Sequence, residues 1–397
     1  MPFEQAEARI AELRTRGAAS RSRRENLDQP VDPDLRVTSK FPEHKLALVV
    51  GGEEVSSLTV VDFRQQIGSQ TVRMGGIASV GTHRDHRFQG YQRRVQESSL
   101  RWMRAEGFDT AMLYGIPSFY PKFGYAQAFA GVEFTLAVRD AEKAEPAGHR
   151  FVDFSPKRHT RAVLKMYHAN NAGRTGPTRR DVRHWVPFRK GIRYDSEAVC
   201  KVALDARGRP AGYFVCHQEH LTATVIEAGF AAPAVLPDIL RAAARLAVRQ
   251  RLESIRLLLP EDDALVACCQ PLGLRKTVHY RAEGGGQVRM IRIPSALSAV
   301  AGELGSRMRT TGRLTLRTNL DDVGLSWSPG RLTVGPAWPR GPQARMPQWA
   351  LAQLLYGYRP AEGLAHEGVL KASAAATAAL AEMFPVRPHY HWLVDHF

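Results

Sequence analysis

The sequence predicts a mixed α/β (α+β) fold in three parts: two tandem domains with mixed sheets and a small α+β domain at the C-terminal end. Three observations support this prediction. The 397 residues exceed what one hydrophobic core normally holds. Residues 80–125 have the pattern of a strand, a glycine turn, a helix and a second strand. The same order of elements begins again after residue 150, which indicates an internal repeat.

The first part, residues 1–142, changes from a helical period to strand periods near Lys45. Alternating apolar residues then predict an antiparallel meander that leads into Val80. Gly107 ends the following helix. The predicted elements are a helix at 3–16, a loose basic arm at 18–33, strands at 46–50, 55–63 and 69–82, a helix at 91–106, a strand at 110–114 and a return strand at 131–137 that closes the sheet.

The second part, residues 143–286, repeats this plan after a linker at 142–148. Thr178 and Asp181 have the spacing of a capping box for a short helix. The predicted elements are strands at 151–154, 198–204, 212–216, 222–230, 254–259 and 278–281, and helices at 160–170, 178–185, 234–250 and 262–272. Ala231-Ala232-Pro233-Ala234 stands where a second glycine turn is expected, so this unit is predicted to keep the fold without a site.

The third part, residues 287–397, follows a glycine hinge at 284–286. Its pattern mixes short strands with amphipathic helices and indicates a small α+β domain. The predicted elements are strands at 288–293, 314–319, 323–327 and 332–334, and helices at 295–308, 348–355 and 374–383. The chain ends in HYHWLVDHF. The spacing of these histidines fits no familiar ligand set, and no metal is expected.

Composition excludes several classes of protein. With 44% hydrophobic and 24% charged residues and no run of about 18 apolar positions, no membrane span is expected. The opening sixteen residues carry glutamates and lack an apolar core, so no secretory signal is expected and a cytoplasmic location follows. The four cysteines lack zinc-site spacing and are expected to be reduced thiols.

The net charge of +16 raises the question of nucleic-acid binding. Arginines are spread along the whole chain, and a local cluster occurs only at 14–24, without interleaved aromatic residues. A solvated basic arm is therefore favoured over a nucleic-acid site, which remains an alternative. The positive charge also suits anionic ligands such as a nucleotide cofactor.

The turn at 87–93 is the first candidate for chemistry. A strand that runs through such a turn directly into a helix exposes backbone N–H groups at the positive end of the helix dipole, which is a phosphate-binding arrangement. Gly90 permits close approach of the backbone, and two arginines add charge. The residues of this candidate site are Arg87, Phe88, Gln89, Gly90, Tyr91, Gln92 and Arg93.

Together with its flanks, this turn resembles the core of the GNAT acyl-CoA N-acetyltransferases. The family pattern is a V-x-V strand, R/Q-x-x-G-x-G/A, a helix, a strand and F-Y-x-x-x-G-F/Y. Here the pattern is present as Val80-Gly81-Thr82, Arg87 to Gln92, and Phe119 to Tyr125. The resemblance implies that the backbone of Val80 and Thr82 pairs with the pantetheine of acetyl-CoA as an added strand. It implies that the segment from Phe88 to Arg93 holds the pyrophosphate.

Tyr120 matches the family's general acid, which protonates the departing thiolate of coenzyme A. A phenol near pKa 10 and a thiol near 8.5 are only modestly mismatched, so this role is chemically sensible. Phe119, Phe123 and Tyr125 are expected to be core residues. Tyr114, near the end of the preceding strand, is a candidate for the wall of the acceptor pocket, with a buried core tyrosine as the alternative.

Gln92 departs from the family pattern, because many members have Gly or Ala there. A large side chain at this position would obstruct the pyrophosphate. The three-part architecture, however, resembles the Eis (enhanced intracellular survival) type of acetyltransferase, in which that position need not be small. That resemblance implies a sterol-carrier-protein-like third domain, a homo-oligomer such as a hexamer, and a terminal Phe397 whose α-carboxylate reaches the active site.

The sequence thus predicts an acetyl-CoA-dependent N-acetyltransferase with catalytic residues Tyr120 and Phe397 and no metal. Direct attack of the amine in a ternary complex is the expected mechanism. The acceptor is a small-molecule or protein amine. Two alternatives stay open: an acyl-CoA-binding or regulatory protein with weakened catalysis, and a basic nucleic-acid-binding protein.

Overall fold

The computed structural model describes residues 24–116, 118–188, 198–219, 222–282 and 284–397. These residues form two compact units. The first unit comprises the described residues up to Phe129, residues 281–387 and Phe397, and the second comprises 130–280 and 388–396. Both combine helices with mixed sheets, so the predicted mixed α/β fold is confirmed. The predicted helix at 3–16 and residues 18–23 of the predicted basic arm lie outside the described residues.

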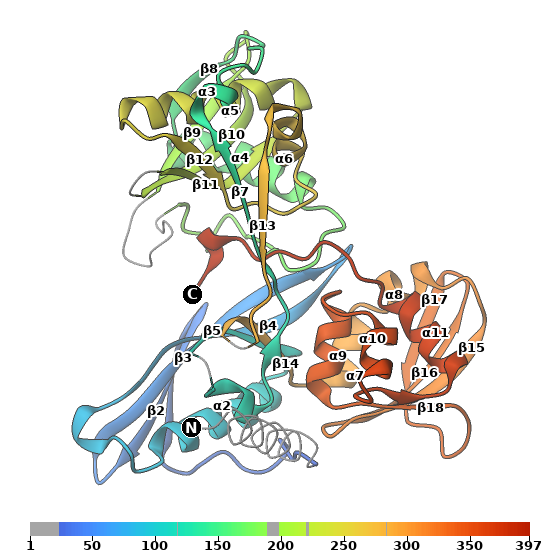
Figure 1. Ribbon diagram of the computed structural model, residues 1–397. Helices are drawn as coiled ribbons and strands as arrows, with labels where there is room; N and C mark the ends of the chain where they lie inside the picture. Colours follow the sequence, from blue (N-terminus) through green and yellow to red (C-terminus); the bar gives the residue numbers. More distant parts are fainter. Residues whose placement is uncertain (1–23, 117, 189–197, 220–221, 283) are drawn as a thin grey trace, which may run out of the picture. The chain divides into compact units, whose positions relative to one another are not determined.

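The first unit contains a seven-stranded sheet in the order β1-β2-β3-β4-β5-β14-β6 (Figure 1). Only the β4–β5 pair is parallel, and helix α2 provides the crossover between these two strands. The elements are β1 Leu35–Lys40, β2 Glu43–Val50, β3 Glu53–Ile67, β4 Gln70–Thr82, β5 Thr110–Gly115, β14 Gly285–Met290, β6 Ala126–Gln127 and α2 Tyr91–Ala105. Val95, Leu100, Trp102 and Met103 of α2 are buried against this sheet, as the helical period requires.

Two strands lie in sheets other than those predicted. The segment 131–137, expected to close the first sheet, is β7 (Gly131–Ala137) of the second unit, where it pairs with β12 and β13. The first sheet instead receives β14, which pairs antiparallel with β5 and β6. Alternation of apolar residues predicts a strand but not its partner, so the sequence pattern did not distinguish these arrangements.

The remainder of the first unit is a five-stranded sheet, ordered β17-β16-β15-β18-β19, with five helices. Helix α9 packs on β14, where Gln348 Oε1 accepts a 2.8 Å hydrogen bond from the Met290 N–H. The elements are α7 Ile293–Ala299, α8 Ala301–Arg307, β15 Gly312–Arg317, β16 Asp322–Ser328, β17 Arg331–Gly335, β18 Gln343–Arg345, α9 Gln348–Leu355, α10 Ala361–His366, β19 Lys371–Ala372 and α11 Ala374–Met383.

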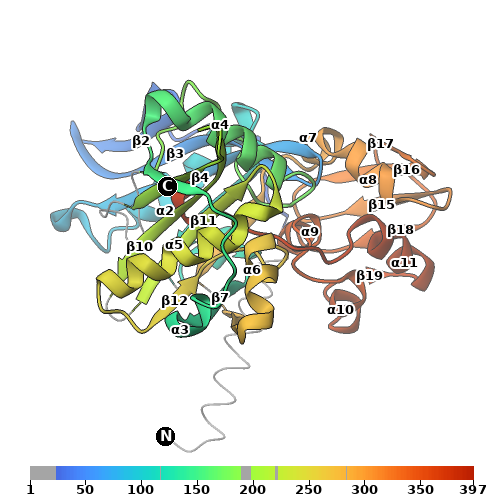
Figure 2. The same cartoon turned by 90° about the horizontal axis from the view of Figure 1, so that it is seen from above.

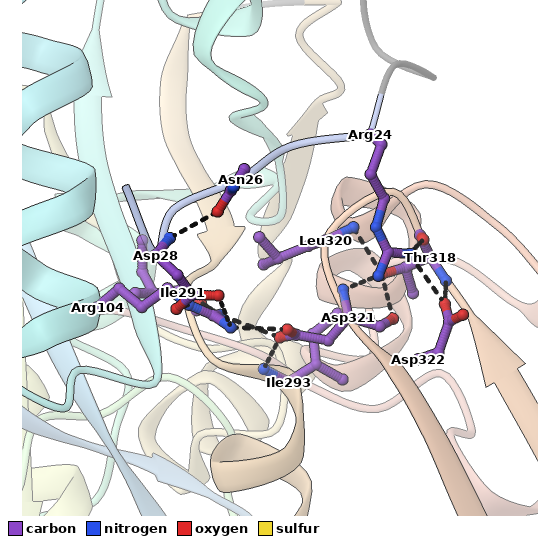
Figure 3. Close-up of polar contacts among 10 residues, drawn as sticks. All are labelled: Arg24, Asn26, Asp28, Arg104, Ile291, Ile293, Thr318, Leu320, Asp321 and Asp322. Carbon is purple, nitrogen blue, oxygen red and sulfur yellow. Dashed lines mark hydrogen bonds and ion pairs between the residues drawn. The ribbon is translucent and has the colours of Figure 1, made fainter. Parts of the chain in front are cut away.

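Arg104, in the last turn of α2, joins these two sheets (Figure 3). Its guanidinium pairs with Asp321 at 2.9 Å and with Asp28 at 2.6 Å, and it also donates to the Ile291 carbonyl. Hydrogen bonding to Arg104 lowers the pKa of Asp28. Arg24, at the edge of the predicted basic arm, donates to the Thr318 carbonyl and pairs with Asp322.

The second unit contains a seven-stranded sheet in the order β13-β7-β12-β11-β10-β9-β8. Helices α4 and α5 pack against β10 and β11 (Figure 2). The elements besides β7 are α3 Val138–Ala141, β8 Arg150–Asp153, α4 Pro156–Asn170, β9 Val199–Leu204, β10 Pro210–Glu219, β11 Thr222–Phe230, α5 Leu236–Arg249, β12 Ser254–Leu257, α6 Ala264–Cys269 and β13 Arg275–His279. The helix predicted at 178–185 is wrong, because this segment forms turns. In the part of the chain that the structure covers, no helix is both long and apolar enough to cross a membrane.

Candidate active site

Strands β4 and β5 part in the middle of the first sheet. Their parallel pairing runs from Met74 opposite Thr110 to Ile77 opposite Leu113 and then stops. Directly afterwards β4 contains a bulge against β3, and Ser79 in the bulge has a φ of 49°. A bulge bends a strand and increases its twist. Among the described strands, none therefore pairs with Val80 and Thr82 on the side that faces β5.

The turn after β4 presents backbone donors and positive charge. Gly90 precedes α2 with a φ of 81°, a conformation that favours glycine. Within the described chain, no acceptor is recorded for the N–H groups of Gln89, Gly90 and Tyr91. Arg87 and Arg93 are exposed and pair with no carboxylate of the described residues, whereas the neighbouring Arg94 pairs with Asp32 and Asp34. This arrangement suits a phosphate group.

Phe88 in this turn is fully exposed and has a φ of 64°. A left-handed conformation is uncommon for a bulky residue and is typical of functional loops rather than of core packing. Gln89 is also exposed, and its Nε2 donates to the Asp85 carbonyl at 3.4 Å. Both side chains therefore leave the backbone of the turn accessible.

Gln92 lies against the end of β4. Its Oε1 accepts 3.1 Å hydrogen bonds from Ser56 Oγ and from Thr82 Oγ1. Ser56 Oγ also lies 2.9 Å from the Gly81 carbonyl oxygen, and its single hydroxyl proton can go to either acceptor. The side chain thus ties the first turn of α2 to β3 and β4 instead of extending from the turn. Its Nε2 is buried and has no recorded partner among the described residues.

Tyr120 packs on the end of β5. It begins the short 3₁₀ helix Tyr120–Phe123, and its ring contacts Phe119 and Tyr125 edge to face at 5.0 and 6.1 Å between centroids. A Cβ placed on Gly115 would lie 2.1 Å from Tyr120 Cδ2, so only glycine leaves room for the ring. Burial raises the pKa of Tyr120. The side chain therefore holds its proton at neutral pH.

The ring of Phe397 lies on the same sheet. Its centroid is 5.4 Å from that of Phe63 and 6.1 Å from that of Tyr114. A Cβ placed on Gly76 would lie 2.7 Å from Phe397 Cδ1. Tyr114 is 37% exposed, which favours the prediction of a pocket wall over that of a buried core residue. Phe397 and Tyr114 are thus in contact. Tyr114 is adjacent in β5 to Gly115, which leaves room for the Tyr120 ring.

Three residues of this site were not predicted from the sequence. Ser56 holds Gln92, and Gly76 and Gly115 make room for rings. The adjacent glycines at 75 and 76 inside a strand pattern were a usable signal, because glycine in a strand often marks close approach of another group. Ser56 carried no such signal.

The second unit has a different arrangement at the corresponding point. Parallel pairing of β11 with β12 ends at Val225 opposite Leu257, and a bulge follows before the buried Glu227. Arg180 pairs with Glu227 and, at 2.9 Å, with Asp395. A buried ion-pair network thus stands at this bulge, and the exposed turn at 231–234 that follows β11 contains no glycine. No group of three or more potential metal-binding side chains gathers among the described residues.

Comparison with known proteins agrees with this geometry. Residues 29–128 match the acetyltransferase (GNAT) domain family. No curated protein matches the chain by sequence. Among solved structures, a probable N-acyltransferase from Enterococcus faecalis V583 is similar with a TM-score of 0.74 and 14% identity over 90% of each chain.

Two further structures cover most of the chain. A GCN5-related N-acetyltransferase from Kribbella flavida has a TM-score of 0.69 and 19% identity over 89% of this chain and 87% of its own. Eis1 from Mycobacterium abscessus has a TM-score of 0.64 and 16% identity over 89% of this chain and 90% of its own. At these identities the likeness establishes the shared fold.

Proposed function

We propose that the chain is an acetyl-CoA-dependent N-acetyltransferase that works by direct attack of an amine in a ternary complex. This proposal rests on one observation: the pairing of β4 with β5 stops beside the first turn of α2. The edge of β4 that faces β5 therefore lies next to a positively charged turn. None of the described strands pairs with this edge. A pantetheine arm needs the first feature and a pyrophosphate the second.

The proposed roles follow from this arrangement. The backbone of Val80 and Thr82 orients the thioester, the segment from Phe88 to Arg93 holds the pyrophosphate, and Arg87 adds positive charge. The amine nitrogen attacks the carbonyl carbon, the C–S bond breaks, and the thiolate takes the phenolic proton of Tyr120. Tyr120 holds its proton at neutral pH and can supply it, while burial raises its pKa and makes the phenol a weaker acid than a solvated tyrosine.

For the acceptor side, we propose that Tyr114 lines the amine pocket and that the α-carboxylate of Phe397 takes the proton that the amine loses. An amine near pKa 10 is mostly protonated at neutral pH and must lose a proton to attack. The contact between the two rings supports the pairing of these roles. The acceptor is a small-molecule or protein amine.

The test is release of coenzyme A thiol from acetyl-CoA with a panel of amines, together with calorimetric titration of coenzyme A. Tyr120→Phe is expected to lower turnover by ~10²-fold or more with nearly unchanged affinity for coenzyme A, because only the transferable proton is removed. Unchanged turnover would contradict the role of Tyr120. Binding of acetyl-CoA by the wild-type protein without turnover of any amine would favour the regulatory acyl-CoA-binding alternative.

We further propose that the α+β part after β14 is a sterol-carrier-protein-like domain and that the chain forms a homo-oligomer such as a hexamer. Both follow only from the resemblance of the three-part sequence pattern to the Eis type. Sedimentation velocity at several concentrations tests the oligomeric state.

A further inference from the structure

A cavity lies at the β6 edge of the first sheet. It has a volume of about 280 Å³ and is bordered by β14, β6, α9 and the segment after Tyr120. In the strand order β4-β5-β14-β6, these strands are not the pair that parts at the candidate active site. A cavity of about 150 Å³ holds benzene, so this one has room for roughly ten non-hydrogen atoms.

Three buried glutamines in the wall of this cavity have unpartnered polar atoms. Gln287 of β14 is fully buried, and neither its Oε1 nor its Nε2 has a hydrogen-bond partner among the described residues. Gln127 stands opposite Gln287 in the β6–β14 ladder, and its Oε1 is also unpartnered. The third is Gln353 of α9, whose Oε1 has no partner, although its Nε2 donates to the Gln127 carbonyl at 2.8 Å.

Such atoms are costly, because an unsatisfied buried polar group loses its hydration without compensation. Native proteins keep few of them, and a cluster calls for an explanation. The terminal torsion of a carboxamide is soft, so these ends can turn toward a ligand without movement of the backbone. The three acceptor atoms require donors, and the one free amide group requires an acceptor.

The charged residues around the cavity favour a negatively charged ligand. Arg281 and Arg359 line it, and no Asp or Glu does. Arg359 is paired with Glu367, whereas Arg281 pairs with no carboxylate of the described residues. An exposed guanidinium that pairs with no carboxylate of the described residues, next to these amides, favours a ligand with a carboxylate. A ligand with a net positive charge, such as the amine that we propose as acceptor, would be repelled here.

We propose that this cavity binds a small carboxylic acid that also carries amino or amide N–H groups, a molecule of amino-acid size. Arg281 pairs with the carboxylate, Gln127 and Gln353 accept from the N–H groups, and Gln287 supplies one donor and one acceptor. The site is separate from the acyl-transfer site. Its wall includes Pro121 and Tyr125, which flank Tyr120.

The experiment measures the melting temperature and the calorimetric affinity of the full chain with three probes. L-Glutamine has both a carboxylate and N–H groups, glutarate has only carboxylates, and glutaramide has only N–H groups. L-Glutamine is expected to raise Tm by about 5 °C near saturation. Glutarate is expected to give a smaller shift and glutaramide none. Failure of L-glutamine to shift Tm, or an equal shift with glutaramide, would overturn the proposal.

Two variants assign the effect to the cavity. Arg281→Met is expected to weaken binding of L-glutamine at least tenfold (about 1.4 kcal/mol). Gln287→Met is expected to raise the Tm of the ligand-free protein by about 2 °C, because it removes unpartnered polar atoms, and to weaken binding of L-glutamine. The matched control is Gln65→Met, since Gln65 is buried but accepts a hydrogen bond from the Tyr356 hydroxyl. Gln65→Met is expected to lower Tm, and a similar loss in Gln287→Met would contradict the proposal.

Discussion

The interpretation of Gln92 changes once the direction of its side chain is known. From the sequence it is a large residue where the GNAT pattern favours a small one, and it therefore casts doubt on pyrophosphate binding. In the fold its amide oxygen accepts hydrogen bonds from Ser56 and Thr82, so the side chain fixes the turn to the end of β4. These hydrogen bonds hold the edge of β4 and the N-terminus of α2 in a fixed relative position. In the proposed function both elements bind the same acetyl-CoA molecule.

Gln92→Ala is expected to raise the Kd for acetyl-CoA about tenfold, because two hydrogen bonds that align the turn are lost. Titration calorimetry with acetyl-CoA and with acetyl-pantetheine, which lacks the pyrophosphate, provides the measurement. The loss should be larger for acetyl-CoA. Glu97→Ala, on the exposed face of the same helix, serves as the control. Tighter binding of acetyl-CoA by Gln92→Ala would mean that the side chain obstructs the site.

Which residues were predictable depends on whether local sequence or tertiary packing determines their role. Tyr120 and Gly90 can be proposed from the sequence because a motif and a turn fix their positions relative to neighbouring residues. The partners of Gln92 and the contact of Phe397 with Tyr114 depend on residues far away in the chain. No local period encodes such contacts, so they required the three-dimensional structure.

Strand β4 provides space for the terminal residue. Gly76→Ala places a methyl group 2.7 Å from the Phe397 ring, which has to move. We expect turnover to fall about tenfold, because displacement of the ring also displaces the group that we propose takes the proton of the amine. Gly335→Ala, in strand β17 with open space around it, is the control. Equal turnover in both variants would exclude Phe397 from catalysis.

Helix α6 begins at a carboxylate with an unfavourable environment. Asp263 caps it by accepting a 2.9 Å hydrogen bond from the Leu265 N–H, and burial raises its pKa to about 6. In the unfolded chain the pKa is near 3.9. The folded state therefore binds a proton more readily, and stability decreases as the pH rises from about 4 to about 6.

Asp263→Asn keeps the cap and removes the charge. We expect this variant to be more stable than the wild type by about 2–3 kcal/mol at pH 7, with a difference that shrinks toward pH 4. Urea unfolding at several pH values, followed by a probe in the second unit, measures it. A constant difference across this range would argue against a charge effect.

Element prediction succeeded where the period was strong. Helix α2 was expected at 91–106 and spans Tyr91–Ala105. Strand β1 was missed, because only Leu35 of its six residues is buried and an exposed edge strand has no apolar alternation. The helix expected at 178–185 relied on a capping pattern without a strong apolar period, and Thr178 Oγ1 has no partner among the described residues.

At the scale of the whole molecule, Arg104 determines how firmly the two sheets of the first unit are joined. Its side chain and that of Asp321 are only 16% and 12% exposed. Asp321→Ala leaves this guanidinium without its buried partner and is expected to destabilise the protein by about 2–3 kcal/mol. Asp28→Ala removes the exposed partner and is expected to cost less than about 1 kcal/mol. Thermal unfolding compares the two variants, and equal losses would contradict this ranking.

Strand β14 also affects how the protein is made. The ribosome completes residues 24–129 long before it reaches Gly285, so the first sheet lacks an inner strand until about 160 further residues have been synthesised. During that time the edges of β5 and β6 are unpaired, and such edges promote aggregation. A gene truncated at residue 129 should therefore yield insoluble protein. Fusion of residues 285–290 to this fragment through a flexible linker should restore solubility.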